Sequence, residues 1–155
     1  MNRSILHPLA AFAFAMISSG AVAQDDDTLP YKEGAVTIVT SVRTEPGKFN
    51  EYFRHLAGPY SQSMEEAKKQ GVVTSYSFFA ANPRSPDEPD LYLVETYPNM
   101  AAFDSVTEKM IAIDKKVYGS MKATDKGYAD RGAIRTILGS EMIRELIPVK
   151  KGSTE

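Results

Sequence analysis

The feature that most constrains this chain is a strand-like stretch that passes directly into a helix-like one. Residues 91–97 (Leu-Tyr-Leu-Val-Glu-Thr-Tyr) are mostly aliphatic, β-branched and aromatic, which is typical of a β-strand. Pro98 ends that strand because it has no N–H to donate, and Asn99 is a suitable N-cap for a helix. The next apolar residues fall three or four positions apart, as one helix face requires. They are Phe103, Val106, Met110, Ile113 and Val117.

The first 23 residues have the three parts of a secretory signal peptide. Arg3 supplies the positive charge, residues 9–17 the apolar core, and Ala21-Val22-Ala23 the small-residue cleavage site. The apolar core is shorter than the roughly 20 residues that cross a bilayer, although a single membrane anchor is the alternative interpretation. We therefore expect cleavage after Ala23 and a periplasmic or secreted protein without membrane attachment after cleavage.

Composition excludes several classes of protein. The sequence has no cysteine, so no disulfide stabilises it, and its net charge of −2 gives no reason to expect binding to nucleic acid. A hydrophobic content of 43% suits one globular domain that is stabilised by its core alone. The expected organisation is a flexible acidic arm over 24–33, a single domain over 34–150 and a tail over 151–155.

The remaining segments predict an α+β domain. We expect strands over 35–43, 72–81, 91–97 and 141–149, a helix from Phe49 that is interrupted at Gly58-Pro59, a helix from Phe103, and an extra helix over 128–138. The order β-α-β-β-α-β, apart from the extra helix, is that of the ferredoxin-like fold. In that fold both helices cover one face of a four-stranded antiparallel sheet.

The strands are apolar on both faces, which two helices on one face do not explain. In the first strand Val36 and Ile38 share one face, whereas Val39 lies on the other. The third and last strands show the same double pattern. A second copy of the chain is the simplest cover for the remaining face, so we predict a homodimer through the sheet. The sequence does not tell which face is the dimer face.

The strand order, the doubly apolar strands and the passage 97–103 (Tyr-Pro-Asn-Met-Ala-Ala-Phe) resemble the dimeric α/β-barrel superfamily over residues 35–149. This superfamily includes antibiotic-biosynthesis-type monooxygenases, haem-degrading monooxygenases, and EthD-like and NIPSNAP-like proteins. The resemblance implies a dimeric α/β barrel. The haem-degrading members use an Asn, a Trp and a His, but this chain has no Trp and its first strand has no Asn. Haem degradation is therefore not expected.

Three residues are candidates for catalysis. His55 is the only histidine after residue 23, and it lies at the edge of the apolar stripe of the first helix. Glu95 shares a strand face with apolar residues, where a carboxylate needs a partner. Tyr76 offers a hydroxyl on an apolar body. For His55 and Tyr76, ordinary packing is the competing interpretation; for Glu95, the alternative to a partner is a retained proton. One histidine and no cysteine supply too few ligands for zinc, and no cofactor motif is present, so we expect neither metal nor cofactor.

Five residues are candidates for ligand binding. Tyr52, Tyr76 and Phe78 supply aromatic surface. Arg131 and Arg135 lie four positions apart, on one face of the expected extra helix, and could hold a carboxylate or phosphate. A solvated helix face is the alternative for the two arginines. Three functions stay open: binding of a small apolar or aromatic molecule between sheet and helices, a cofactor-independent monooxygenase or isomerase, and a structural or assembly role without ligand.

Overall fold

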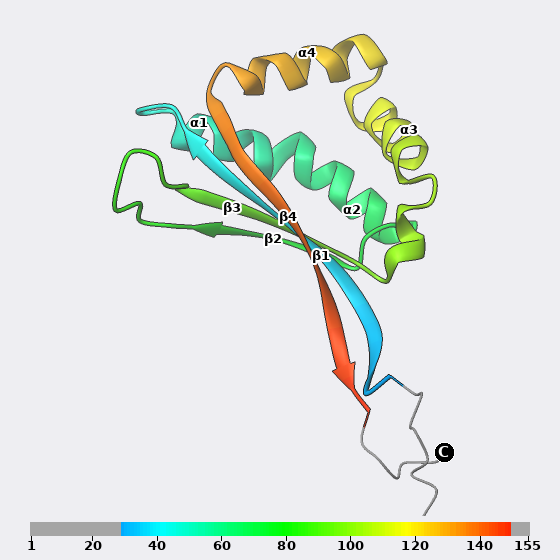
Figure 1. The fold of residues 1–155 in the computed structure, drawn as a ribbon. Helices are drawn as coiled ribbons and strands as arrows, with labels where there is room; N and C mark the ends of the chain where they lie inside the picture. Colours follow the sequence, from blue (N-terminus) through cyan, green and yellow to red (C-terminus); the bar gives the residue numbers. More distant parts are fainter. Residues whose placement is uncertain (1–28, 150–155) are drawn as a thin grey trace, which may run out of the picture.

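The computed structural model describes residues 29–149, which form four strands and a set of helices (Figure 1). In chain order they are β1 (Tyr31–Thr44), α1 (Phe49–His55), the π-helical segment η1 (Leu56–Tyr60), α2 (Ser61–Lys69), β2 (Ser75–Ala80), β3 (Leu91–Tyr97), the 3-10 helix η2 (Met100–Phe103), α3 (Val106–Tyr118), α4 (Met121–Gly132) and β4 (Arg135–Pro148). The predicted signal peptide, most of the predicted arm and the tail lie outside these residues.

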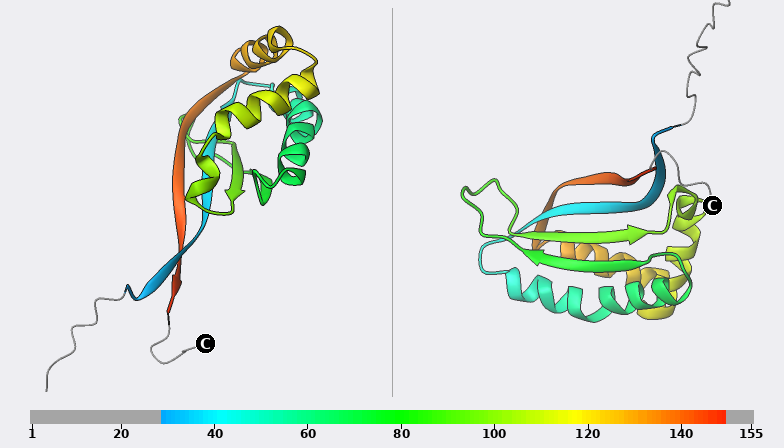
Figure 2. Two further views of the ribbon diagram at one scale, coloured as in Figure 1. Left: turned by 90° about the vertical axis from the view of Figure 1, so that its right-hand side faces the viewer. Right: turned by 90° about the horizontal axis from the view of Figure 1, so that it is seen from below.

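The strands form one antiparallel sheet in the order β2-β3-β1-β4. The helices lie together on one face of that sheet (Figure 2). The predicted α+β, ferredoxin-like architecture is thus confirmed. β1 and β4 are twice as long as the other two strands, with 14 residues each, and they run on together as a two-stranded ribbon beyond the body of the domain.

The register decides which side chains face the helices. Val42 lies opposite Leu91, and Val36 opposite Tyr97, and all four are buried. Val42 and Leu91 pack with Leu56 of the helical layer, so this parity is the inner face. Ile38 belongs to the same parity and packs against the core, whereas Val39 points to the outer face. Within residues 29–149, no element covers that outer face.

The first helix bends where the sequence predicts an interruption. Pro59 has no N–H and lies in the π-helical segment between α1 and α2, and Gly58 has a non-helical backbone conformation. The hydroxyl of Ser61 donates to the carbonyl of Leu56 over 2.6 Å, which satisfies one of the acceptors that the bend would leave free. Gly71 follows α2 with φ of 69°, as expected of a helix terminator.

Several boundaries differ from the sequence-based expectation, and β2 covers only Ser75–Ala80 of the segment expected over 72–81. The extra helix is α4, which begins after Ser120 and ends at Gly132, so Arg135 is not on it but is the first residue of β4. β4 therefore starts six residues before residue 141. The reason is tertiary: β1 extends to Thr44, which pairs with Arg135 and draws the polar and β-branched residues after α4 into the sheet. Likewise β1 begins at Tyr31, inside the segment that we expected to be a flexible arm.

The helix expected from Phe103 is divided. Asn99 does act as an N-cap, because its side-chain oxygen accepts from the amide of Ala102 over 3.2 Å, but the helix that it caps is η2. Ser105 then adopts a left-handed conformation with φ of 59°, and α3 starts after it.

Candidate functional site

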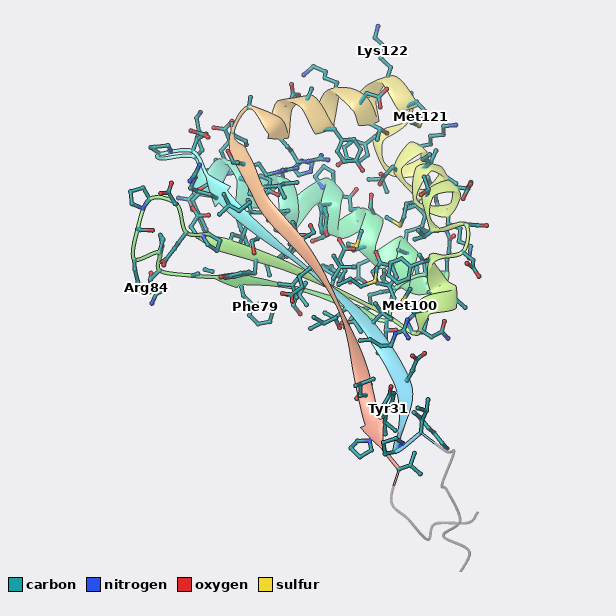
Figure 3. The ribbon with its side chains drawn as sticks, in the orientation of Figure 1. Tyr31, Phe79, Arg84, Met100, Met121 and Lys122 are labelled. Carbon is teal, nitrogen blue, oxygen red and sulfur yellow. The ribbon has the colours of Figure 1, made fainter. Side chains whose placement is uncertain are left out.

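A partly open cavity of about 180 Å³ lies between the inner face of the sheet and the helices. Side chains of both layers project into the space between sheet and helices (Figure 3). The floor comes from β1, β3 and β4, with Thr40, Val42 and Leu93 among its residues. The walls come from α1, η1, α2, α3 and α4. Four tyrosines contribute to them: Tyr52, Tyr60, Tyr118 and Tyr128.

One end of the cavity carries two arginines. Arg131, in the last turn of α4, is only 6% exposed, and its Nη1 donates to Nε2 of His55 over 2.8 Å and to the hydroxyl of Tyr118 over 3.2 Å. Its guanidinium carbon lies 4.2 Å from the ring centre of Tyr128, a cation–π contact. None of these partners is an anion. Within residues 29–149, Arg131 makes no ion pair.

Arg135 stands beside Arg131 in the cavity lining although it belongs to β4. Its guanidinium carbon lies 5.5 Å from the ring centre of Tyr52, and its buried Nε has no hydrogen-bond partner among residues 29–149. In the part of the chain that the structure describes, Arg135 also lacks an ion pair. A buried donor without an acceptor costs about 1–3 kcal/mol, so this end of the cavity has unused capacity to bind an acceptor.

Both arginines affect the protonation of His55. Burial, followed by the positive charges of Arg131 and Arg135, lowers the pKa of His55 to about 4. The imidazole is therefore neutral at neutral pH, and its Nε2 accepts the hydrogen bond from Arg131. This bond occupies the lone pair that a general base would need. His55 thus borders the site as a neutral partner of Arg131.

A carboxylate lies at the other end of the cavity. Glu95 accepts hydrogen bonds from the hydroxyl of Tyr60 and, over 2.7 Å, from the hydroxyl of Tyr97. Burial and the adjacent Glu95 charge raise the pKa of both tyrosines, so both keep their protons and remain donors. The sequence-based expectation that Glu95 needs a partner is met by two hydroxyl groups.

A second carboxylate, Asp114 of α3, is satisfied in the same way. Its two oxygens accept from the hydroxyls of Ser63 over 2.7 Å and Tyr128 over 2.9 Å. Burial and the bond to Asp114 raise the pKa of Tyr128 to about 12. Both acids of the cavity are therefore bonded to hydroxyl groups, while neither arginine pairs with a carboxylate of the described part of the chain.

The predicted site residues divide into two groups. Tyr52, Glu95, Arg131 and Arg135 line the cavity, and His55 touches it through Arg131. Tyr76 and Phe78 lie on the inner face, but outside the cavity. They belong to the edge strand β2, where their rings stand 5.7 Å apart, and the cavity lies over β1, β3 and β4.

Sequence reasoning missed Asp114 and Tyr118. Asp114 follows Met110 by four positions, so an acid on the apolar face of that helix was the available signal. Tyr118 gave no comparable signal, because its hydroxyl meets Arg131 and His55 only through the packing of α3, α4 and α1.

Among residues 29–149, no group of three histidine, cysteine or acidic side chains comes close enough to hold a metal ion. Over the same residues, no helix has the length and apolar content needed to span a membrane.

Comparisons with known proteins identify structures of similar arrangement. HapK from Hahella chejuensis matches with a TM-score of 0.47 and 11% identity, over 77% of this chain and 96% of HapK. SO0527 from Shewanella oneidensis matches with a TM-score of 0.47 and 17% identity, over 76% of this chain and 98% of SO0527. A protein from Chloroflexus aurantiacus that is described as an antibiotic biosynthesis monooxygenase matches with a TM-score of 0.40 and 11% identity. The match covers 77% of this chain and 97% of the Chloroflexus chain. No protein-family model and no curated protein matches the sequence.

Proposed function

We propose that this protein is an exported homodimer that binds a small aromatic or apolar molecule in the cavity between sheet and helices. The cavity itself is the observation that carries the proposal. A cavity of roughly 150 Å³ admits a benzene molecule, so 180 Å³ is of the size that one substituted ring requires. Tyr52 and Tyr60 offer ring faces, and Val42 and Leu93 offer aliphatic surface.

The bonding in the cavity favours binding over acid–base chemistry. His55 already accepts from Arg131, and its lowered pKa makes it a weak base. The alternative function, a cofactor-independent monooxygenase or isomerase, would have to use Glu95 as base with Tyr60 as donor, since both reach the cavity. In that case Glu95→Gln would abolish turnover while ligand still bound. A purely structural or assembly protein would leave the cavity without a role.

The dimer is supported by apolar side chains on the outer sheet face. Phe79 of β2 is 54% exposed and points away from the helices (Figure 3), and Ile143 of β4 is 47% exposed. Val39 and Val94 pair at the centre of the same face. A face of this kind on a stable protein calls for a cover. A second copy of the sheet supplies one, with an expected interface of roughly 1,600 Å² or more in total. Export is supported by the signal-peptide pattern of residues 1–23, and fractionation of cells that produce the tagged full chain tests it.

Ligand binding is tested by filling the cavity. Thr40 lies on the inner face of the central strand β1 and lines the cavity. Thr40→Phe places a ring where the ligand would lie, whereas Thr40→Val exchanges the hydroxyl, which bonds to Ser140 over 2.8 Å, for a methyl group of similar size. Single-ring probes (phenol, benzamide and benzoate) are titrated by calorimetry. Binding to wild type and to Thr40→Val, with loss in Thr40→Phe, supports the proposal. Equal affinity in all three proteins places binding elsewhere and refutes it.

A further inference from the structure

The two carboxylates and the two arginines of the cavity are not paired with each other. Glu95 and Asp114 use hydroxyl donors, as described above, whereas the bonds of Arg131 within residues 29–149 go to the neutral acceptors His55 and Tyr118. Two cations thus line the cavity without an ion-pair partner among residues 29–149. Burying such charges is costly unless an anion accompanies them.

The positions of the charged groups along the sheet give the cavity a direction. Arg135 lies opposite Thr44 of β1, while Glu95 lies opposite Ile38, six residues away along the same strand. Aromatic and aliphatic side chains occupy the intervening floor and walls, among them Tyr52 and Leu93. A ligand with its anionic group at the arginines would have its apolar body between the two ends, and would keep its charge away from Glu95. Asp114 lies nearer the arginines, since Tyr128 contacts both it and Arg131, but its two oxygens already accept from Ser63 and Tyr128.

Two neighbouring groups respond to the positive end. The charges of both arginines contribute to the lowered pKa of His55, and the same charges oppose the rise that burial causes in the pKa of Tyr52. The arginines therefore create a local positive potential around Tyr52, which lines the cavity, and around His55, which contacts Arg131. Only Nη1 of Arg131 is used by its bonds to His55 and Tyr118, and a guanidinium has further N–H donors on its other nitrogens.

We propose that the ligand is a small aromatic acid whose carboxylate binds Arg131 and Arg135 while its ring occupies the tyrosine-lined cavity. This inference rests on the proposed function and names its ligand class. A guanidinium binds a planar carboxylate through two parallel hydrogen bonds, which a neutral amide of the same shape does not reproduce. The volume near 180 Å³ limits the body of the ligand to about one ring.

The test compares benzoate with benzamide, which has the same ring but no charge, by calorimetric titration of the purified protein. We expect benzoate to bind at least about tenfold more tightly, the effect of one charge-assisted pair. Arg135→Gln should remove this preference. Arg144→Gln is the matched control, because Arg144 is in the same strand but pairs with Glu33, away from the cavity, and it should keep the preference. Thermal melting verifies that both variants are folded.

The outcomes separate the two proposals. Equal binding of benzoate and benzamide, lost in Thr40→Phe, overturns the anionic class and leaves the cavity as a binding site. Failure of benzoate, benzamide and phenol alike to bind wild type overturns the proposed function together with this inference. Inorganic phosphate that binds as tightly as benzoate overturns the requirement for a ring. A preference that persists in Arg135→Gln overturns the role of that arginine.

Discussion

Arg131 donates from Nη1 to Nε2 of His55 over 2.8 Å, so a buried guanidinium and an imidazole share a hydrogen bond that requires the imidazole to be neutral. The pKa of His55 is about 4 in the folded protein, below its ordinary value of 6.5. Between these values the unfolded chain binds more protons than the folded one. The stability contributed by neutral His55 is therefore complete above pH 6.5 and is lost as the pH falls towards 4.

This pH dependence can be measured on residues 24–155, in which His55 is the single histidine. Urea unfolding at pH 7.5 and pH 5 should give a lower midpoint at pH 5, and His55→Gln should lose part of that difference. The C2 proton of the imidazole, followed by NMR, should titrate near pH 4. Titration near pH 6.5 would contradict the buried arrangement.

Two adjacent residues of β1 lie on opposite faces of the sheet, so the same substitution should have different consequences at each. Ile38 faces the core, so Ile38→Asp should unfold the domain, because an unpaired charge buried among apolar residues costs several kcal/mol. Val39 lies on the outer face, so Val39→Asp should leave the fold intact and dissociate the proposed dimer. Circular dichroism reports folding and light scattering reports mass. A wild-type monomer at micromolar concentration would refute the dimer.

The bond between Tyr60 and Glu95 predicts a loss of stability in Tyr60→Phe. The substitution removes one of the two hydroxyl donors of Glu95, and a hydrogen bond to a charged group contributes about 1.5–3 kcal/mol. The matched control is Tyr76→Phe, because Tyr76 lies opposite Glu95 on β2 but its hydroxyl makes no hydrogen bond within residues 29–149. We expect the control to lie within about 0.5 kcal/mol of wild type in urea unfolding. Equal losses in both variants would show that the Glu95 bond is not the cause.

Two glycines of α4 should respond differently to alanine. A Cβ at Gly127 would lie 3.1 Å from Cε1 of Tyr118, whereas a Cβ at Gly132 would meet no atom within 4 Å. Gly132→Ala should therefore be neutral or stabilise by up to about 1 kcal/mol, through the higher helix propensity of alanine.

Gly127→Ala should not show this gain in stability, because Tyr118 must move to make room for the new Cβ. The hydroxyl of Tyr118, which contacts His55 and Arg131, would move with it. Thermal melting compares the stability of the two variants, and benzoate titration reports on the site. A Gly127→Ala variant as stable as Gly132→Ala, with unchanged benzoate binding, would show that Tyr118 yields without cost.

The sequence predicted correctly those elements whose bounds are set by their own residues. The strand over 91–97 appears with the predicted bounds, because its composition and the following proline both favour that ending. The break at Gly58-Pro59 appears because a missing N–H is a property of the residue itself. β4 was predicted too short, since Arg135 and Thr136 carry no strong strand signal and join the sheet only because β1 is long enough to pair with them.

The candidate site was predicted only in part, because side-chain chemistry can be read from the sequence but position in space cannot. Tyr52, Glu95, Arg131 and Arg135 were selected by side-chain chemistry, and all four line the cavity. The expectation that Arg131 and Arg135 share a helix face was wrong, yet they meet in space, because the chain turns between α4 and β4. Tyr76 and Phe78 have the right chemistry but belong to β2, at the far edge from β4.

The sequence by itself determined the order of strands and helices and the presence of apolar residues on both strand faces, because periodicity and chain-breaking residues act over a few positions. Only the tertiary structure decided that Ile38 faces inward and Val39 outward, since register is set by pairing with β3 and by the helices that cover one face. It also decided that the arginines are left without carboxylate partners in residues 29–149. Glu95 and Asp114 instead accept from the hydroxyls of Tyr60 and Tyr128, and these contacts join residues that are 35 and 14 positions apart.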